Sequence, residues 1–416
     1  MATSSDTEPR PSRIRSRRVS YLGLLEEVTR NTVKLSQEQK QRLDAYVAAG
    51  YDVAKLQFSD ADVKNQKDHV EHIVKTLVHE LGEHFPALKV RKQLGTGSFY
   101  NNTRILSPDE FDYLLILCLT SQVEKEETGN DSVKIKVIDE SLRKYMKKYL
   151  STYSDNLSGP LLTDDNFLQS EQFVGVLINT IHECLEQLQK KGVISYKGKH
   201  VFEHSIDTLK AQDTMLEYNM LKYAKPEYQP DDESYIPELS LHDVILDELP
   251  HGAAVRLRVQ GPLGPADIDL GFCIESSTTG AGRYISIPLG MGNEWVPSFY
   301  QNLSHPKLNE HHGKILTFLK YLLRECKLVS NYTFNSHNLK TCVVIHQKVC
   351  EQKQYDKDRS LGGCLIDIAF YMFEKRGKIW KTFDELLIPY KEECTLPNIN
   401  FPGETVTAWI PWQPLC

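Results

Sequence analysis

Long apolar runs are missing from this 416-residue sequence, and none approaches the roughly 18 consecutive apolar residues that a membrane-spanning helix requires. Cys-x-x-Cys pairs are missing too, because the nine cysteines are spread singly along the chain. This spacing favours reduced thiols over a disulfide framework. The arginines near the N-terminus are not followed by an apolar segment, so the sequence predicts no secretory signal. We therefore expect no membrane partner and a cytoplasmic protein.

An excess of positive charge is also absent, since the formal net charge is −7. This value argues against a surface coated in positive charge, but it leaves room for a local basic groove. The hydrophobic fraction of 40% and the charged fraction of 25% are typical of a globular protein. The length allows two or three domains, or one large two-lobed body. Residues 1–18, rich in Ser, Pro and Arg, are predicted to form a disordered basic tail.

The stretch Gly95 to Leu117, GTGSFYNNTRILSPDEFDYLLIL, carries the strongest chemical signal. Glu110 and Asp112 are spaced i, i+2 in a strand-like run, which points both carboxylates to one face of an extended chain. Two such carboxylates can hold magnesium, which in turn binds substrate phosphates. Gly97-Ser98 upstream lets backbone N–H groups and a hydroxyl approach a phosphate. Because Glu-x-Asp alone is common on solvated strands, a third carboxylate on a later strand would strengthen this interpretation.

A later segment supplies further carboxylates. Residues 254–259 alternate as a strand, two Gly-Pro pairs mark a turn, and residues 266–274 alternate again. The second strand carries Asp267 and Asp269, again spaced i, i+2 and facing one way. Alternation alone does not choose between these two aspartates.

Hydrophobic spacing predicts the remaining elements. Ser59 is the predicted N-cap of a long amphipathic helix that ends near Pro86. Helical patterns between Tyr21 and Gln57 are interrupted at Gly50. Further helices are expected over residues 139–150, 165–191, 314–326, 336–350 and 361–375, a hairpin or flexible insert over 121–132 with a return strand at 134–137, and a surface loop over 222–250. The predicted fold is α+β, with an N-terminal helical extension (19–58), a mixed-sheet core lobe (59–290) and a C-terminal helical lobe (291–416).

These motifs, in this order, resemble the family of cyclic GMP-AMP synthase and the animal cGAS-like receptors. The matching segments are TGSFYNNTRILSPDEFDYLLIL, AVRLRVQGPLGPADIDLGFCIES, LTFLKYLL and FNSHNLKTCVVIH, which together span most of residues 60–373. The resemblance implies a two-lobed nucleotidyltransferase fold with a long spine helix in its catalytic lobe. It also implies an innate immune sensor of antiviral defence that joins ATP and a second NTP, GTP or UTP, into a cyclic dinucleotide and releases pyrophosphate.

The resemblance further implies roles for individual residues. It assigns Glu110, Asp112 and Asp267 as catalytic carboxylates that hold Mg²⁺ or Mn²⁺, and it prefers Asp267 because Asp-Ile-x-Leu matches the family's strand. Asp269 is its competitor by geometry. The implied nucleotide-binding residues are Gly97, Ser98, Lys320, Ser336 and His337, the last standing where the family commonly stacks a tyrosine on the base.

Two departures from the family pattern bear on ligands. Val296, after Trp295, stands where the cyclic GMP-AMP synthase has an arginine, and a valine cannot make that residue's paired hydrogen bonds to guanine. The second base of the product is therefore open, and a pyrimidine is one candidate. The family's zinc thumb has no counterpart between Trp295 and Lys314, where His305, His311 and His312 occur without a cysteine until Cys326. We expect no zinc.

Members without the thumb resemble invertebrate receptors, several of which sense double-stranded RNA, so duplex RNA rather than DNA is the expected activating ligand. Its candidate contacts are basic clusters that solvated helix faces explain equally well: Arg143, Lys144, Lys147 and Lys148; Lys190, Lys191, Lys197 and Lys199; and Arg10, Arg13, Arg15, Arg17 and Arg18. Oligomerisation on the ligand is left open. The alternative functions are a nucleotidyltransferase that makes linear oligonucleotides and a non-catalytic scaffold of the same fold, although a scaffold has no need of three converging carboxylates.

Overall fold

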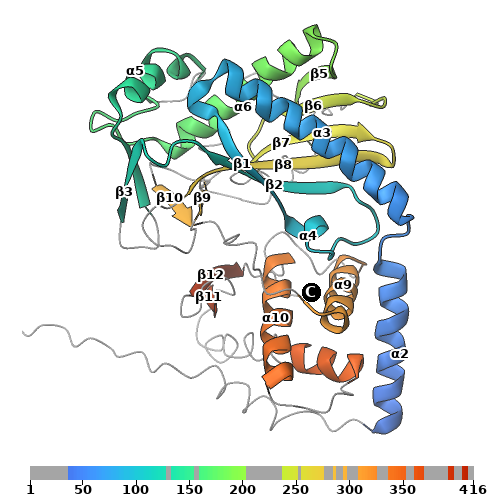
Figure 1. Ribbon diagram of the computed structural model, residues 1–416. Helices are drawn as coiled ribbons and strands as arrows, with labels where there is room; N and C mark the ends of the chain where they lie inside the picture. Colours follow the sequence, from blue (N-terminus) through green and yellow to red (C-terminus); the bar gives the residue numbers. More distant parts are fainter. Residues whose placement is uncertain are drawn as a thin grey trace, which may run out of the picture.

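The computed structural model describes residues 36–127, 133–153, 159–202, 237–251, 254–275, 284–286, 294–297, 308–325, 336–352, 360–369, 392–397 and 405–410. Figure 1 shows a sheet covered by two helices, with a group of helices lying below the sheet. The expected basic tail of residues 1–18 lies outside the described residues, as does most of the loop expected at 222–250.

A mixed sheet forms the larger body. Its strand order is β3-β4-β10-β9-β8-β7-β6-β5, with β2 paired to β8 and β1 paired to β2. The strands are β1 (Val90–Thr96), β2 (Glu110–Leu117), β3 (Val123–Glu127), β4 (Val133–Val137), β5 (Ser195–His200), β6 (Asp243–Asp247), β7 (Ala254–Gly261), β8 (Gly264–Glu275), β9 (Tyr284–Ser286) and β10 (Glu294–Pro297). The pairs β2–β8 and β5–β6 are parallel and the other pairs are antiparallel. The predicted mixed sheet and mixed α and β content are therefore confirmed.

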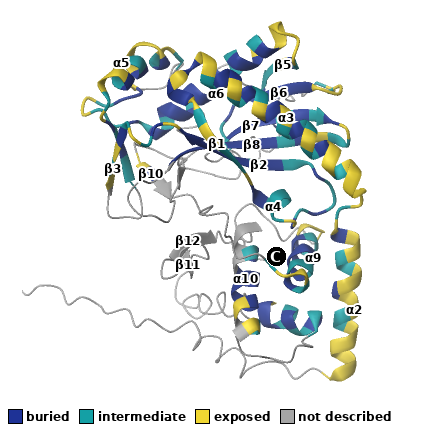
Figure 2. Cartoon of the chain, viewed as in Figure 1, coloured by how far each residue is buried: buried dark blue, intermediate teal, exposed yellow. Residues whose placement is uncertain are grey.

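Two long helices, α3 (Asp60–His84) and α6 (Ser170–Lys190), cover one face of this sheet (Figure 1). The Ser59 side chain accepts the N–H of Asp62, so the predicted cap of α3 is confirmed. The α3 stripe and the apolar face of α6 lie in the same core as the strands. Figure 2 shows buried positions on the central strands and exposed positions along both helices. Helix α6 begins five residues later than expected, because Leu162 and Leu168 are engaged in a β-bridge ahead of it.

A second, smaller core joins α2 (Gln37–Ala54), α9 (Glu310–Glu325), α10 (Ser336–Gln352) and the helical residues 361–369. Val47 of α2 lies in this core, so the N-terminal helix belongs to the helical body and is not a separate extension. The expected break at Gly50 is wrong, because α2 is continuous there. A Cβ on Gly50 would lie 2.4 Å from the Phe318 ring, so the glycine serves close helix packing.

The structure also contains strands that the sequence analysis did not predict. β6 lies within the segment expected to be a surface loop, and all of its residues are buried. β10 extends the sheet beyond residue 290, where the helical lobe was expected to begin. β11 (Glu392–Pro397) and β12 (Thr405–Ile410) form a separate antiparallel pair in the region expected to be helical. Helix α4 (Gly97–Tyr100) lies between the sheet and the helical body, whereas α5 (Glu140–Lys148) and the short 3-10 turns at Pro86–Leu88 and Leu150–Tyr153 pack into the larger body (Figure 1).

Among the residues that the structure describes, no helix combines the length and the apolar character needed to cross a membrane.

Candidate functional site

The parallel pairing of β2 with β8 brings the two acidic strands side by side. Glu110 is opposite Asp267, and Asp112 is opposite Asp269. Carboxylate oxygens of Glu110, Asp112 and Asp269 all lie within 4.8 Å of one another. The three side chains therefore form an oxygen-rich group on one face of the sheet, which we call the carboxylate group.

Asp267 does not join the carboxylate group. Its side chain makes a bidentate pair with Arg258 of β7, with oxygen to nitrogen distances of 2.6 and 3.1 Å. The resemblance preferred Asp267 as the third carboxylate, whereas the structure brings Asp269 to Glu110 and Asp112. The register of β2 and β8 places Asp269 opposite Asp112 and places Asp267 opposite Glu110, where Asp267 pairs with Arg258.

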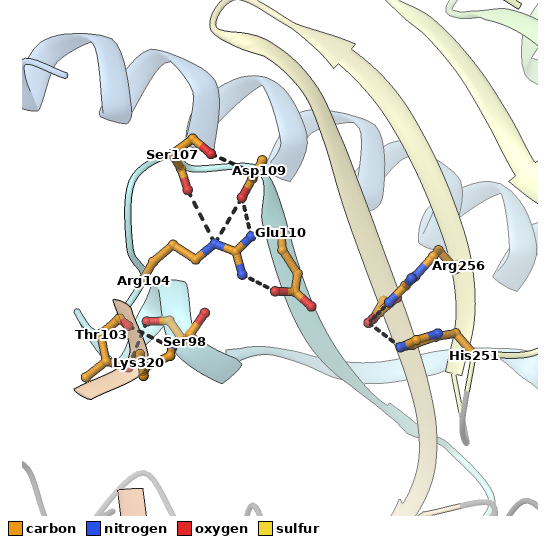
Figure 3. Close-up of polar contacts among 10 residues, drawn as sticks. Ser98, Thr103, Arg104, Ser107, Asp109, Glu110, His251, Arg256 and Lys320 are labelled. Carbon is orange, nitrogen blue, oxygen red and sulfur yellow. Dashed lines mark hydrogen bonds and ion pairs between the residues drawn. The ribbon is translucent and has the colours of Figure 1, made fainter. Parts of the chain in front are cut away.

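Two arginines that the sequence analysis did not select hold the carboxylate group in this structure. Arg104 contacts both Asp109 and Glu110, and Arg256 of β7 makes a bidentate pair with Asp269 at 2.7 and 2.9 Å. Figure 3 shows Arg104 between Asp109 and Glu110, and shows Arg256 and His251 directed at one carboxylate from β7 and its flanking loop. The register of the β7–β8 hairpin explains these pairs, because Arg256 is directly opposite Asp269 and Arg258 is directly opposite Asp267.

Asp112 is the member of the group with the most perturbed ionisation. Burial, followed by the charges of Glu110 and Asp269, raises the pKa of Asp112 to about 7, while Arg104 and Arg256 act in the opposite direction. Asp112 is therefore partly protonated near neutral pH. A cation bound between the three carboxylates would favour the ionised form of Asp112.

We expect Asp112→Asn to stabilise the metal-free protein at alkaline pH. Because the pKa of Asp112 is raised in the folded protein, its ionisation lowers the free energy of unfolding. This loss of stability is small below the unfolded pKa near 4 and grows as the pH rises from there to about 7. Asparagine removes this charge at nearly constant volume, which predicts a gain on the order of a few kcal/mol at pH 8 and little change at pH 4. Thermal unfolding in a chelating buffer at pH 4, 6 and 8 measures it. A gain that is the same at all three pH values would contradict the assigned cause.

Gly97 makes the approach to Asp112 possible. It follows β1, whose last residue Thr96 pairs with Asp112, and it has a φ of +70°. A Cβ at this position would lie 1.6 Å from Oδ2 of Asp112. Only a glycine combines this backbone conformation with this contact. The predicted Gly97-Ser98 turn is therefore adjacent to the carboxylate group.

Ser98 and Lys320 complete the described part of the site. The Ser98 hydroxyl is buried and has no hydrogen-bond partner within the described residues, although the Ser98 carbonyl accepts the N–H of Thr103. Lys320 of α9 is only 8% exposed, and its Nζ donates to the Thr103 carbonyl at 2.8 Å (Figure 3). Burial and then the nearby Arg104 lower the pKa of Lys320 to about 8. The structure buries Lys320, which the resemblance implied as a nucleotide-binding residue, against the loop that follows Ser98.

The other expected nucleotide contacts are only partly described. Ser336 and His337 begin α10, and Val296 lies in β10, but their side chains lie outside the described part of the structure.

The expected contacts to an activating ligand fall at two places. Arg143, Lys144, Lys147 and Lys148 of α5 line a hollow of about 520 Å³ together with Glu140 and Asn166. Lys197 and Lys199 lie on β5, at the opposite end of the strand order from β3 and β4. Lys197 pairs with Asp243 at 3.4 Å, and Lys199 donates to Asn179 at 2.5 Å. The α5 cluster is therefore the more concentrated of the two surfaces.

No protein-family model matches the chain.

Proposed function

We propose that the chain is a two-lobed nucleotidyltransferase that uses Mg²⁺ or Mn²⁺ to join ATP and a second NTP into a cyclic dinucleotide with release of pyrophosphate. We further propose that it acts in the cytoplasm as an innate immune sensor of double-stranded RNA. The observation that carries the proposal is the convergence of Glu110, Asp112 and Asp269 from two adjacent strands, beside a glycine turn and a buried lysine. Three like charges brought together in a partly buried site are costly unless positive charge compensates them.

The residues present fit a divalent metal ion. The donors are carboxylate oxygens, which Mg²⁺ and Mn²⁺ prefer, and they lie within 4.8 Å of one another. The pKa of Asp112 is raised first by burial and then by the charges of Glu110 and Asp269, and Arg104 and Arg256 do not fully offset these effects. Glu110, Asp112 and Asp269 would hold the ion. When bound, it would lower the pKa of an attacking ribose hydroxyl and stabilise charge on the phosphate oxygens.

The remaining residues of the site have roles that follow from their positions. Gly97 lets the Asp112 carboxylate lie against the turn, where the Cβ of any other residue would collide with it. The buried Ser98 hydroxyl is available as a hydrogen-bond donor to a phosphate. Lys320 brings a positive charge from the helical body to the same loop, and it is protonated below its pKa of about 8. In this arrangement the protein positions and stabilises the reacting groups and forms no covalent bond to them.

A ligand-induced switch fits the loop between α4 and β2. Asn102 and Leu106 of this loop adopt positive φ values of 55° and 63°, which cost free energy for residues other than glycine. The loop is held from the helical body by Lys320 and by α2, whose last residue Ala54 accepts the N–H of Leu106. The two contacts are made by Thr103 and Leu106, which lie on either side of Arg104. An activating ligand would need to favour a second arrangement of this loop.

For the RNA ligand, we expect that charge reversal of Lys147 and Lys148 weakens activation by at least about tenfold at low salt, because phosphate contacts dominate such binding. Both lysines line the α5 hollow. Manganese-supported basal turnover should be unchanged, since neither residue contacts the carboxylate group. Activity at a series of duplex RNA and salt concentrations measures the effect.

The matched control reverses Lys40 and Arg42 on α2, which changes the charge equally in the other body. Reversal of Lys197 and Lys199 tests the second candidate surface in the same way. A nucleic-acid activator would be ruled out if neither duplex RNA nor duplex DNA raised activity and if none of these variants differed from the unaltered protein.

One experiment tests the proposed function as a whole. The protein is incubated with all four NTPs, Mg²⁺ or Mn²⁺, and duplex RNA or duplex DNA in turn, and the products are identified by mass. A cyclic dinucleotide supports the proposal and identifies the second base. A linear oligonucleotide would support the alternative nucleotidyltransferase, and no product in any condition would favour a non-catalytic scaffold.

A further inference from the structure

A second group of metal-binding side chains lies in the helical body, away from the carboxylate group. It consists of His312 on α9, His346 and Cys350 on α10, and Cys364 on the helix at residues 361–369. Their ligand atoms lie within 4.8 Å of one another. His346 and Cys350 share one face of α10 because they are spaced i, i+4. The group therefore joins three helices that come together only in the folded chain.

The two histidines are oriented in the same way. His312 and His346 are each 4% exposed, and the Nε2 atom of each is buried without a hydrogen-bond partner within the described residues. The other ring nitrogen is directed at an oxygen: Nδ1 of His312 lies 2.8 Å from Asn309 Oδ1, and Nδ1 of His346 lies 3.9 Å from Asp367 Oδ2. His312 shows the pattern of metal-binding histidines, in which a hydrogen bond at one nitrogen leaves the lone pair of the other for the metal, and at His346 the carboxylate is at ion-pair distance. A buried nitrogen with no partner is otherwise costly.

The two cysteines have a separation that fits a shared metal ion. Cys350 Sγ and Cys364 Sγ are 3.7 Å apart. Two thiolates at about 2.3 Å from one tetrahedral ion would be about 3.8 Å apart, whereas the sulfurs of a disulfide are separated by only about 2 Å. The thiolate is the form that binds metals.

We propose that His312, His346, Cys350 and Cys364 form a structural zinc site that fastens α9, α10 and the helix at residues 361–369 together. Two nitrogen and two sulfur donors in a tetrahedral arrangement favour Zn²⁺ over Mg²⁺ or Ca²⁺. Four protein ligands fill the coordination sphere, so the site has no open position for a substrate and its role is structural. The proposal does not depend on the proposed function.

The inference departs from the expectation of a zinc-free protein. That expectation considered only the segment between Trp295 and Lys314, in which thiols are absent. The structure buries His312, and the two thiols come from helices further along the chain. The proposed ligands are therefore far apart in the sequence, and a search within one segment does not find them.

The proposed zinc would also support the candidate active site. His312 and Lys320 are two turns apart on α9, and Lys320 contacts Thr103 beside the carboxylate group. The helix at residues 361–369 is further attached to α2, because the N–H of Gly362 donates to Asp44 Oδ1 at 2.6 Å. Loss of the ion should therefore weaken the packing of the helical body before it affects the sheet.

Metal analysis of the full-length protein, purified under reducing conditions without added zinc, tests the proposal. We expect about one zinc ion per chain, lowered at least about tenfold in Cys350→Ser and Cys364→Ser. Cys342→Ser and His311→Gln are matched controls, because Cys342 is a buried cysteine of the same helix as Cys350, His311 is adjacent to His312, and neither belongs to the group. Both controls should keep their zinc. Zinc content that is equal in all four variants would overturn the proposal.

A measurement on the unaltered protein covers the case in which the serine variants do not fold. Cobalt is exchanged into the protein, and the visible spectrum is recorded. Thiolate-to-cobalt charge transfer and tetrahedral bands, with a melting temperature that falls when a zinc chelator is added and recovers with Zn²⁺, support the site. A spectrum without thiolate bands, or a melting temperature that neither chelator nor Zn²⁺ changes, would overturn it.

Discussion

Replacement of Asp112 or Asp269 with asparagine should abolish nucleotidyl transfer, whereas replacement of Asp267 should leave most of it. Each change removes one charge at nearly constant volume. Asp112 and Asp269 lie in the carboxylate group, so their loss removes donors to the metal ion and should lower turnover by about 10³-fold or more. Asp267 is paired with Arg258, so its loss should affect mainly that ion pair.

Pyrophosphate release in Mg²⁺, at saturating NTP and activator, measures the effect, and thermal unfolding shows that each variant is folded. Asp267→Asn is the matched control because it lies on the same strand, two residues away, and faces the same side. If Asp267→Asn were inactive and Asp269→Asn active, Asp267 would be the third catalytic carboxylate, as the resemblance implies. Retained turnover in both Asp112→Asn and Asp269→Asn would refute the site.

The second large effect is expected for Gly97→Ala. The new methyl group would lie 1.6 Å from Asp112 Oδ2, so Asp112 or the turn must move. Because metal and phosphate positions tolerate little displacement, we expect turnover to fall by about 10²-fold or more while the protein remains folded. Pyrophosphate release and metal titration measure the two consequences.

Gly192→Ala separates backbone strain from the collision. Gly192 has the same φ of +70°, but a Cβ there meets nothing within 4 Å. This control should lose about 1 kcal/mol of stability from the positive φ and keep its turnover. Equal loss of activity in both variants would show that strain, and not contact with Asp112, accounts for the effect of Gly97→Ala.

Local sequence patterns predicted much of the fold. The spacing of apolar residues in α3, its Ser59 cap and the alternation in β2, β7 and β8 are properties of neighbouring residues, and each element appears where it was expected. β6 was missed because Val244, Ile245 and Leu246 stand in a segment rich in acidic residues and proline, where composition suggested a loop. Its burial depends on pairing with β5 and β7, which a local pattern does not contain.

The candidate site shows the same division between local and tertiary information. The sequence by itself determined that Glu110 and Asp112 share a face, that Asp267 and Asp269 share a face, and that a glycine turn precedes them, because strand alternation has a period of two. Only the tertiary structure decided that Asp269 joins Glu110 and Asp112, since the register of a parallel pair is set by the packing of both strands.

The proposed zinc site of His312, His346, Cys350 and Cys364 depends still more on tertiary structure. The i, i+4 spacing of His346 and Cys350 on a predicted helix is visible in the sequence, and it was the available signal for this group. His312 and Cys364 lie 34 residues before His346 and 14 residues after Cys350. They reach the same point only because the apolar faces of α9, α10 and the helix at residues 361–369 bury one another in a common core.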